Sequence, residues 1–241
     1  MGKTTTAVNM AASLAVAEKR VLLVDTDSQG NTTSGLGIER NSSDLSLYDF
    51  YFGGIPLQDI IVDTALPYLK LVPSSLDLVG AEIELTSMPD KETILRSGIL
   101  TIHDRFDYVI IDCPPALGLL TLNALVAAQT VMVPVQCEYY ALEGLGQLMR
   151  TVELVRNSFN PILEIEGILL TMVDMRNSLA KQVAAEVKKH FGEKVYHTMI
   201  PRNVTLSEAP SHGKPVMLYD IRSKGAQSYL ALAREVLLQD G

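Results

Sequence analysis

The first residues of the chain have the types and spacing that bind phosphate. Gly2, Lys3, Thr4 and Thr5 match the second half of the pattern G-x-x-x-x-G-K-[ST], and apolar residues at helical spacing follow over residues 6–18. A helix N-terminus attracts anions because its first N–H groups point outward unpaired. In such a site Lys3 would contact the β- and γ-phosphates as a catalytic group, Thr4 would ligate Mg²⁺, and Thr5 would bind the α-phosphate. The pattern predicts a nucleotide site.

Two apolar runs downstream end in carboxylates. Residues 21–24 and 108–111 are continuously apolar, which is typical of parallel strands covered on both faces, and they are followed by Asp25, Asp27 and Asp112. In open α/β sheets the ligand crevice lies at the carboxyl ends of the strands. Asp112 would therefore join the Mg²⁺ shell, Asp27 would orient the attacking water, and Asp25 would support the metal shell. Acids also commonly end strands or cap helices, so each aspartate alone leaves that alternative open.

The elements that must position these residues alternate along the chain. We expect strands at 21–24, 69–72, 108–111, 130–135, 166–172 and 195–200. Helices are expected at 6–18, 45–53, 57–62, 76–100 with a break near Pro89, 117–127, 142–159, 180–191 and 225–238, and loops at 31–44 and 203–212. The order predicts an α/β fold in which a mainly parallel, twisted sheet has helices on both faces.

Composition sets limits on the class of protein. The 241 residues fit one α/β domain, residues 1–241, and 47% apolar residues exclude a mainly disordered chain. A net charge of −8 argues against a surface coated in basic charge but leaves room for a local basic patch. The only two cysteines, Cys113 and Cys137, form no C-x-x-C pair, and no apolar run approaches the ~18 residues of a membrane span. We expect a reduced, cytoplasmic protein that does not enter a membrane.

Four stretches carry a specific resemblance. They are GKTTTAVNMAASLA (2–15), RVLLVDTDSQGNTTSGLG (20–37), FDYVIIDCPPALGLLTLNAL (106–125) and IPRNVTLSEAPSHGKPVMLYDIRSKGA (200–226). The sequence resembles the ParA/Soj family of chromosome- and plasmid-partitioning ATPases, within the MinD/ParA group of deviant Walker-A P-loop proteins. The resemblance covers essentially the whole chain. It implies an ATPase that uses Mg²⁺, forms a homodimer with ATP, binds DNA of the nucleoid without sequence preference, and is switched off when a ParB-type centromere-binding protein stimulates hydrolysis.

The resemblance also assigns roles to residues. It implies that Asp27 positions the hydrolytic water, that Asp112 belongs to the metal shell, and that Pro201 and Asn203 lie in the loop that holds the adenine. Arg176 matches a position through which the family contacts DNA.

The chain departs from the family in its DNA-binding stretch. Thr205 stands where a basic residue is common, which removes one phosphate contact and predicts weaker DNA binding unless residues such as Arg202 and Arg222 compensate.

A second departure concerns the phosphate loop. The family loop reads K-G-G-x-G-K-T-T, and its first lysine, its two glycines and the strand before it are absent from this sequence, in which Met1 occupies the variable position. We therefore expect that the native protein starts upstream of Met1. An inactive truncated remnant is the alternative.

A MinD-like division-site ATPase is a further alternative. That class needs a C-terminal basic amphipathic helix, and residues 228–241 contain one arginine and no basic face.

Overall fold

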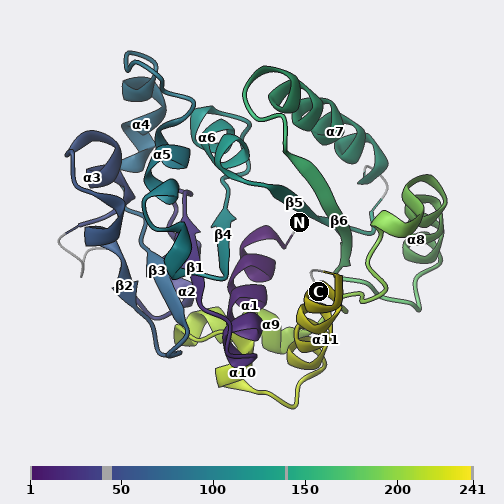
Figure 1. Cartoon of the computed structure of the whole chain (residues 1–241). Coiled ribbons are helices and arrows are strands. Elements are labelled where there is room, and N and C mark those ends of the chain that lie inside the picture. Colours follow the sequence, from purple (N-terminus) through teal and green to yellow (C-terminus); the bar gives the residue numbers. More distant parts are fainter. Residues whose placement is uncertain (1, 40–44, 139–140, 240–241) are drawn as a thin grey trace.

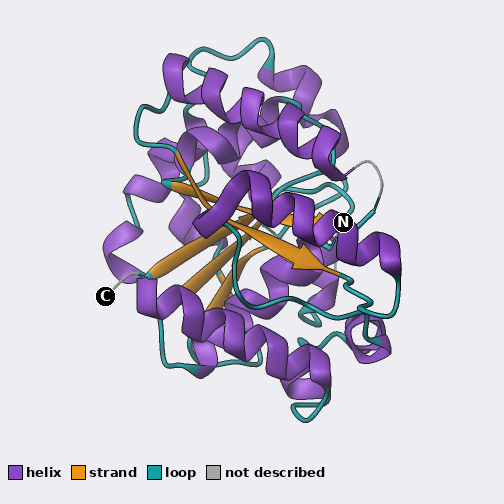
Figure 2. Ribbon diagram, turned by 90° about the vertical axis from the view of Figure 1, so that its right-hand side faces the viewer, coloured by secondary structure: helices purple, strands orange, loops and turns teal. Residues whose placement is uncertain are grey.

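The chain forms an α/β fold whose strands are enclosed between helices (Figures 1 and 2). A computed structural model describes residues 2–39, 45–138 and 141–239, so Met1 lies outside the described residues. The strands are β1 (Val21–Asp25), β2 (Val62–Asp63), β3 (Leu69–Val72), β4 (Tyr108–Asp112), β5 (Thr130–Gln136) and β6 (Glu164–Thr171). The α-helices are α1 (Lys3–Val16), α2 (Asn31–Gly35), α3 (Leu47–Phe52), α4 (Leu78–Leu85), α5 (Ile94–Leu100), α6 (Leu119–Ala127), α7 (Ala141–Ser158), α8 (Ser178–Phe191), α9 (Val204–Glu208), α10 (Val216–Tyr219) and α11 (Lys224–Gln239). Short 3₁₀ helices lie at Leu57–Ile60, His103–Arg105, Gly192–Lys194 and Ala209–His212.

The strands form two sheets. The larger has the order β2-β3-β1-β4, in which β1 pairs in parallel with both neighbours and β2 pairs antiparallel with β3. The smaller consists of the parallel pair β5-β6. The predicted α/β fold with mainly parallel strands is confirmed, but the described strands do not form one continuous sheet, because β4 and β5 do not pair with each other.

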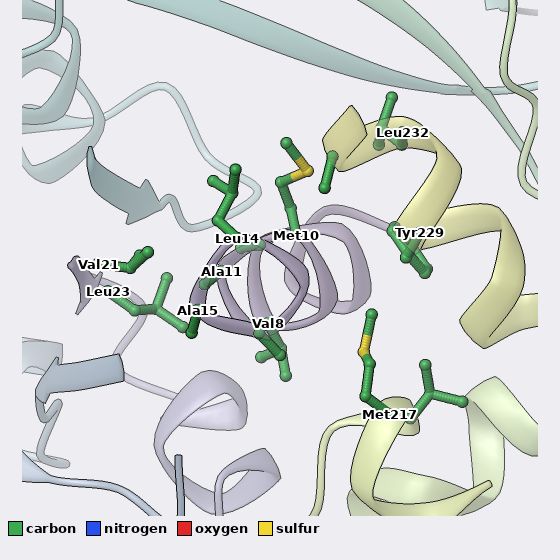
Figure 3. Close-up of a cluster of buried hydrophobic side chains, with 14 of the residues drawn as sticks. Val8, Met10, Ala11, Leu14, Ala15, Val21, Leu23, Met217, Tyr229 and Leu232 are labelled. Atoms are coloured by element: carbon green, nitrogen blue, oxygen red, sulfur yellow. The ribbon is translucent and has the colours of Figure 1, made fainter. Parts of the chain in front are cut away.

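Residues of β1 alternate between two apolar clusters. Val21 and Leu23 pack with α1 and α11, and Figure 3 shows them beside Leu14 of α1, with Tyr229 of α11 on another side of that helix. Leu22 and Val24 belong to the cluster on the other face, which α3, α4, α5 and α6 cover. This alternation is the two-residue period of a strand, and it explains why the run is apolar throughout. Helices on both faces are thereby confirmed.

The predicted strand at 195–200 is wrong. The segment forms an isolated bridge with β6 between Val195 and Ile168, and the Tyr196 and Ile200 N–H groups donate to the Ile168 and Leu170 carbonyls at 3.1 and 2.9 Å. In between, the backbone N–H groups of His197 and Thr198 donate to the Glu235 carboxylate of α11, at 2.6 and 2.9 Å. The segment cannot pair continuously with β6 because these donors are turned toward α11.

Two predicted loops also contain helices. Residues 31–35 form α2, which starts after Gly30 in the left-handed region with φ 59°, and residues 204–208 form α9, capped by the Asn203 side chain. The predicted helix over 57–62 is a 3₁₀ turn followed by β2. In the part of the chain that the structure describes, no helix is long and apolar enough to cross a membrane.

Candidate nucleotide-binding site

The start of α1 lies at the carboxyl ends of the strands, as the sequence predicts. Gly2 has φ 78° and caps the helix, with its carbonyl accepting from the Thr6 N–H at 2.9 Å. This left-handed conformation favours glycine. A Cβ at Gly2 would lie 3.6 Å from the Thr171 hydroxyl at the end of β6. The Lys3 ammonium donates to the Pro114 carbonyl, two residues beyond β4, at 2.8 Å. The N-terminus of α1 therefore touches the ends of strands from both sheets.

Asp112 and Thr4 meet as predicted. Asp112 ends β4 and is only 2% exposed. It accepts hydrogen bonds from Thr32 Oγ1, at 2.7 Å, and from the Thr4 hydroxyl. Burial raises the pKa of Asp112, although these two bonds and the Lys3 charge oppose the shift.

A hydroxyl and a carboxylate at a phosphate site are ligands that suit Mg²⁺. Among the described residues no group of three or more histidine, cysteine or acidic side chains is placed to hold a metal. Magnesium with one or two protein ligands takes its remaining oxygens from phosphates and water, so the Thr4–Asp112 pair fits a nucleotide-bound ion.

Asp25 lies deeper than the other two aspartates. It is fully buried, and one carboxylate oxygen accepts from the Thr33 N–H and hydroxyl, at 2.8 and 2.7 Å. The other oxygen accepts from the Asp27 N–H at 3.2 Å. Burial, with a smaller contribution from the Asp112 charge, raises the pKa of Asp25 to about 7. Asp25 thus ties α2 to the end of β1, and its support of a metal shell stays a prediction.

Asp27 is held beside Asp112. One carboxylate oxygen of Asp27 accepts from the Gln29 N–H at 3.0 Å, and the Asp27 carbonyl accepts from the Ser74 hydroxyl at 2.6 Å. The charge of Asp27 contributes to the raised pKa of Asp112, so the two carboxylates are close enough to interact. This location agrees with the predicted role of Asp27 in orienting water, which stays a prediction.

A polar cavity of about 210 Å³ lies at the ends of β5 and β6. Its lining includes Glu138, Met172, Asp174 and Arg202. The Met172 methyl group lies 3.9 Å from the position that a Cβ of Gly2 would occupy. A larger cavity of about 380 Å³, between α3 and α5, includes none of the predicted site residues.

The predicted adenine loop borders the polar cavity. Pro201 bridges Val173, Arg202 lines the cavity, and the Asn203 side chain accepts from the Leu206 N–H at 3.3 Å. The Asn203 side chain is therefore engaged in capping α9. Contact of Pro201 and Asn203 with an adenine stays a prediction.

The structure brings together two of the three arginines predicted to bind DNA. The Arg176 guanidinium donates to the Asp174 carboxylate at 2.9 and 3.0 Å, and these bonds lower the pKa of Asp174 to about 2. The charge of Arg202 lowers it further, which places this exposed arginine nearby. Arg222 lies in the α10–α11 connection, and no contact among the described residues joins it to the other two.

Sequence reasoning missed the hydroxyls that orient the carboxylates. Thr32 and Thr33 of α2 bind Asp112 and Asp25, and the Thr26 hydroxyl donates to the Asp112 carbonyl at 2.7 Å. The available signal was the run of small hydroxyl residues that follows Gly30, close behind an aspartate-terminated strand.

Comparison with known proteins agrees with this geometry. Residues 1–165 match a family model described as an AAA domain. The chain is 54% identical over 240 residues to the chromosome partitioning protein ParA of Myxococcus xanthus, covering 100% of this chain and 85% of the relative. It is 56% identical over 236 residues to the sporulation initiation inhibitor protein Soj of Bacillus subtilis, covering 98% and 93%.

A solved structure also matches. Cobyrinic acid a,c-diamide synthase from Mycobacterium smegmatis, with bound ADP and magnesium, superposes with a TM-score of 0.85 at 36% identity, covering 98% of this chain and 89% of that one. The match to the partitioning proteins extends over essentially the whole chain at 54% and 56% identity, so the chain belongs to the ParA/Soj family of P-loop ATPases.

Proposed function

We propose that this protein is an ATP-dependent switch for the partitioning of chromosomal or plasmid DNA. The observation that carries the proposal is the meeting of Thr4 and Asp112 at the N-terminus of α1, with Lys3 and Asp27 beside them. A helix N-terminus, a lysine and a hydroxyl–carboxylate pair together suit a nucleotide triphosphate with Mg²⁺. The relatives named for chromosome partitioning support the biological role.

In this proposal, individual residues of the chain have separate roles in ATP hydrolysis. Lys3 exchanges its bond to the Pro114 carbonyl for the β- and γ-phosphates of ATP. Thr4 and Asp112 would hold Mg²⁺, which when bound would neutralise charge on the phosphate oxygens. Asp27 accepts a hydrogen bond from the water that attacks the γ-phosphate, and the products are ADP and inorganic phosphate. Most of the rate enhancement comes from positioning and electrostatics.

The proposed switch acts through binding to DNA and to a partner protein. We infer that the ATP-bound homodimer binds nucleoid DNA non-specifically in the cytoplasm, and that a ParB-type protein stimulates hydrolysis and releases it. Arg176 and Arg202 are suited to phosphate contacts, but the net charge is −8 and Arg176 already pairs with Asp174. DNA binding should therefore be weak and strongly salt-dependent.

Nucleotide binding without turnover is a second candidate. One observation favours it: the sheet is divided between β4 and β5, beside the phosphate site. A site assembled across that division would hold nucleotide less rigidly than catalysis requires.

A membrane-bound, MinD-like function has no support from α11. Tyr229, Leu232 and Val236 of this helix are buried in the cluster that contains α1, and the last turn of the helix carries no basic residue. An interfacial helix needs its apolar face free and a basic polar face.

Nucleotide binding and phosphate release, measured on the same preparation, test the proposal. A fluorescent ATP analogue should bind in the presence of Mg²⁺ and lose affinity in Thr4→Ala, whereas Asp27→Ala should bind it and hydrolyse no ATP. Binding without hydrolysis in the parent protein would select the second candidate. Failure to bind the analogue would exclude both. DNA binding is measured separately at low salt with ATP, and its absence would remove the partitioning role alone.

A further inference from the structure

The hydroxyl of Tyr51 is buried without a hydrogen-bond partner. Tyr51 lies in α3, is only 3% exposed, and belongs to the apolar cluster that contains Leu22 and Val24 of β1 and Val72 of β3. Within the described part of the chain, no donor or acceptor is placed to bond its hydroxyl oxygen. An unpaired buried hydroxyl destabilises a folded protein, so its presence in a well-packed cluster requires a physical explanation.

The surroundings of Tyr51 hold this hydroxyl in place. The ring of Tyr51 packs beside its neighbours, with centroids 5.5 Å from that of Phe50 and 6.1 Å from that of Phe52. The first turn of α3 is joined to the end of β3, because the Leu47 N–H donates to the Pro73 carbonyl at 2.9 Å. The hydroxyl therefore cannot turn out to solvent without movement of the helix.

The neighbour of this hydroxyl is the segment that follows β4. The charge of Cys113 contributes to the raised pKa of Tyr51, so the two side chains are close enough to interact. Cys113 precedes Pro114, whose carbonyl accepts the bond from Lys3 at 2.8 Å. Lys3 and Tyr51 belong to α1 and α3, which cover opposite faces of the larger sheet. Segment 113–115 is therefore bonded to Lys3 from one face and adjoined by Tyr51 from the other.

ATP would change the hydrogen bonds of this segment. In the function proposed above, Lys3 leaves the Pro114 carbonyl for the phosphates, so the segment loses a donor. Pro114 and Pro115 have no backbone N–H with which to form a replacement bond. The segment directly follows Asp112, and its movement would displace the carboxylate that pairs with Thr4. A new donor from the α3 face would keep that carboxylate in place.

We propose that Tyr51 is a positioning residue, whose hydroxyl donates to a backbone carbonyl of residues 113–115 once ATP has drawn Lys3 away from Pro114. The proposal rests on the proposed function, because it requires nucleotide to bind at Lys3. It also explains why the hydroxyl is unpaired in the structure. A hydrogen bond that forms only in the ATP-bound state raises the affinity for ATP and adds nothing to the stability of the free protein.

Tyr51→Phe removes the hydroxyl and keeps the ring. The free variant should resist urea at least as well as the parent protein, because it no longer buries an unpaired polar group. Its dissociation constant for a fluorescent, non-hydrolysable ATP analogue with Mg²⁺ should rise by about threefold to tenfold, as expected for the loss of one hydrogen bond. A purely structural role would give the opposite pair of results, a lower urea midpoint and an unchanged affinity.

Tyr48→Phe is the matched control, since it makes the same change one turn earlier in α3. The Tyr48 hydroxyl already donates to the Glu84 carboxylate at 3.1 and 3.3 Å, so the affinity for the analogue should equal that of the parent protein. Amide hydrogen exchange over residues 116–122 gives a local measurement. Binding of the analogue should slow this exchange in the parent protein and in Tyr48→Phe, and slow it less in Tyr51→Phe.

Each contrary outcome has a distinct meaning. Equal affinities in the parent protein and Tyr51→Phe would overturn the role of Tyr51 and leave the proposed function intact. A lower urea midpoint of free Tyr51→Phe would show that the hydroxyl is already bonded without nucleotide, which also overturns that role. An equal loss of affinity in Tyr48→Phe would assign the effect to α3 in general. If the parent protein failed to bind the analogue, the proposed function would be excluded and the role of Tyr51 with it.

Discussion

β1, which has a neighbour on each side in the larger sheet, is more deeply buried than β4 and β5, the strands that border the division between the two sheets. All five residues of β1 are buried, and Val21 to Val24 have no exposed area. In β4 and β5, which border the division, most residues are only partly buried. β1 has a hydrogen-bonded neighbour on each side, whereas β4 and β5 each have one among the described strands. Burial of an apolar strand therefore follows from its neighbours as well as from its own sequence.

The candidate site is divided in the same way. Asp25, Asp27 and Asp112 follow strands of the larger sheet, whereas the polar cavity lies at the ends of β5 and β6. The start of α1 joins them, since Lys3 bonds to Pro114 beyond β4 and Gly2 lies against Thr171 of β6. The carboxylates are fixed by many hydrogen bonds within one sheet, but a nucleotide would span both parts. Substitutions in each part can therefore distinguish residues that act in ATP hydrolysis from residues that stabilise the fold around the site.

The largest effect on ATP hydrolysis is expected at Lys3, at the start of α1, where the two parts of the site meet. Lys3→Ala should lower the rate of ATP hydrolysis by about 100-fold or more, because the γ-phosphate loses a preorganised positive charge. Phosphate release at saturating ATP is the measurement. Lys19→Ala, just past the other end of α1, is the control and should keep full activity. Equal rates in the parent protein and Lys3→Ala would exclude Lys3 from catalysis.

Truncation of matched valines tests the contrast in packing. Val24 in β1 has no exposed area and Val135 in β5 is 7% exposed. Val24→Ala should lower the free energy of unfolding by about 2–3 kcal/mol, since the cavity lies between two packed faces, and Val135→Ala by about 1 kcal/mol. Urea denaturation with unchanged m-values measures both. Equal losses would show that the division of the sheet does not weaken packing around β5.

The sequence was sufficient to predict the elements that local pattern controls. The apolar runs at 21–24 and 108–111 predicted buried parallel strands; the parallel pairing is confirmed for both, but the burial is confirmed only for β1, because residues 108–111 are half-buried. The aspartates that follow these runs were expected to join one site with Thr4, and Asp112 lies beside Thr4. The helix at 31–35 was missed because its order comes from distant carboxylates that bind its threonines, not from a helical pattern. The false strand at 195–200 has a similar cause, because its conformation depends on Glu235 on a helix distant in sequence. Such hydrogen bonds are not part of a local helix or strand pattern, and for α2 the sequence offers only the run of small hydroxyl residues after Gly30.

The buried carboxyl of Asp25 predicts a pH dependence in the larger sheet. Its pKa is raised from 3.8 to about 7, mainly by burial. The folded state therefore favours the protonated form, and this contribution to stability is fully present below pH 3.8 and lost as the pH rises through about 7.

Substitution isolates this contribution. Asp25→Asn removes the titration. As the pH rises across this range, the unfolding free energy of the parent protein should therefore fall relative to that of the variant, by at most about 1.4 kcal/mol per pH unit. Urea denaturation at a series of pH values measures the difference. A difference that does not vary between pH 4 and 8 would show that Asp25 titrates normally.

The smallest effect on stability is expected at Glu235, beside β6, whose pKa is shifted in the opposite direction to that of Asp25. Burial would raise the pKa of Glu235, but its hydrogen bonds from Thr198 and His197 outweigh burial and lower it from 4.5. Glu235→Gln keeps an acceptor but loses the charge, and should lower the free energy of unfolding at neutral pH by about 1 kcal/mol. Glu153→Gln, on the exposed face of α7, is the control.

The pH dependence of this loss distinguishes the two parts of the molecule. A carboxylate with a lowered pKa stabilises the folded state above its unfolded pKa of 4.5, and that contribution disappears as the pH falls through the folded value. The cost of Glu235→Gln should therefore vanish in acid. The parent protein's disadvantage relative to Asp25→Asn, by contrast, should grow as the pH rises toward 7. If both differences changed in the same direction with pH, the two carboxyls would share one environment and the contrast between the sheets would not extend to their electrostatics.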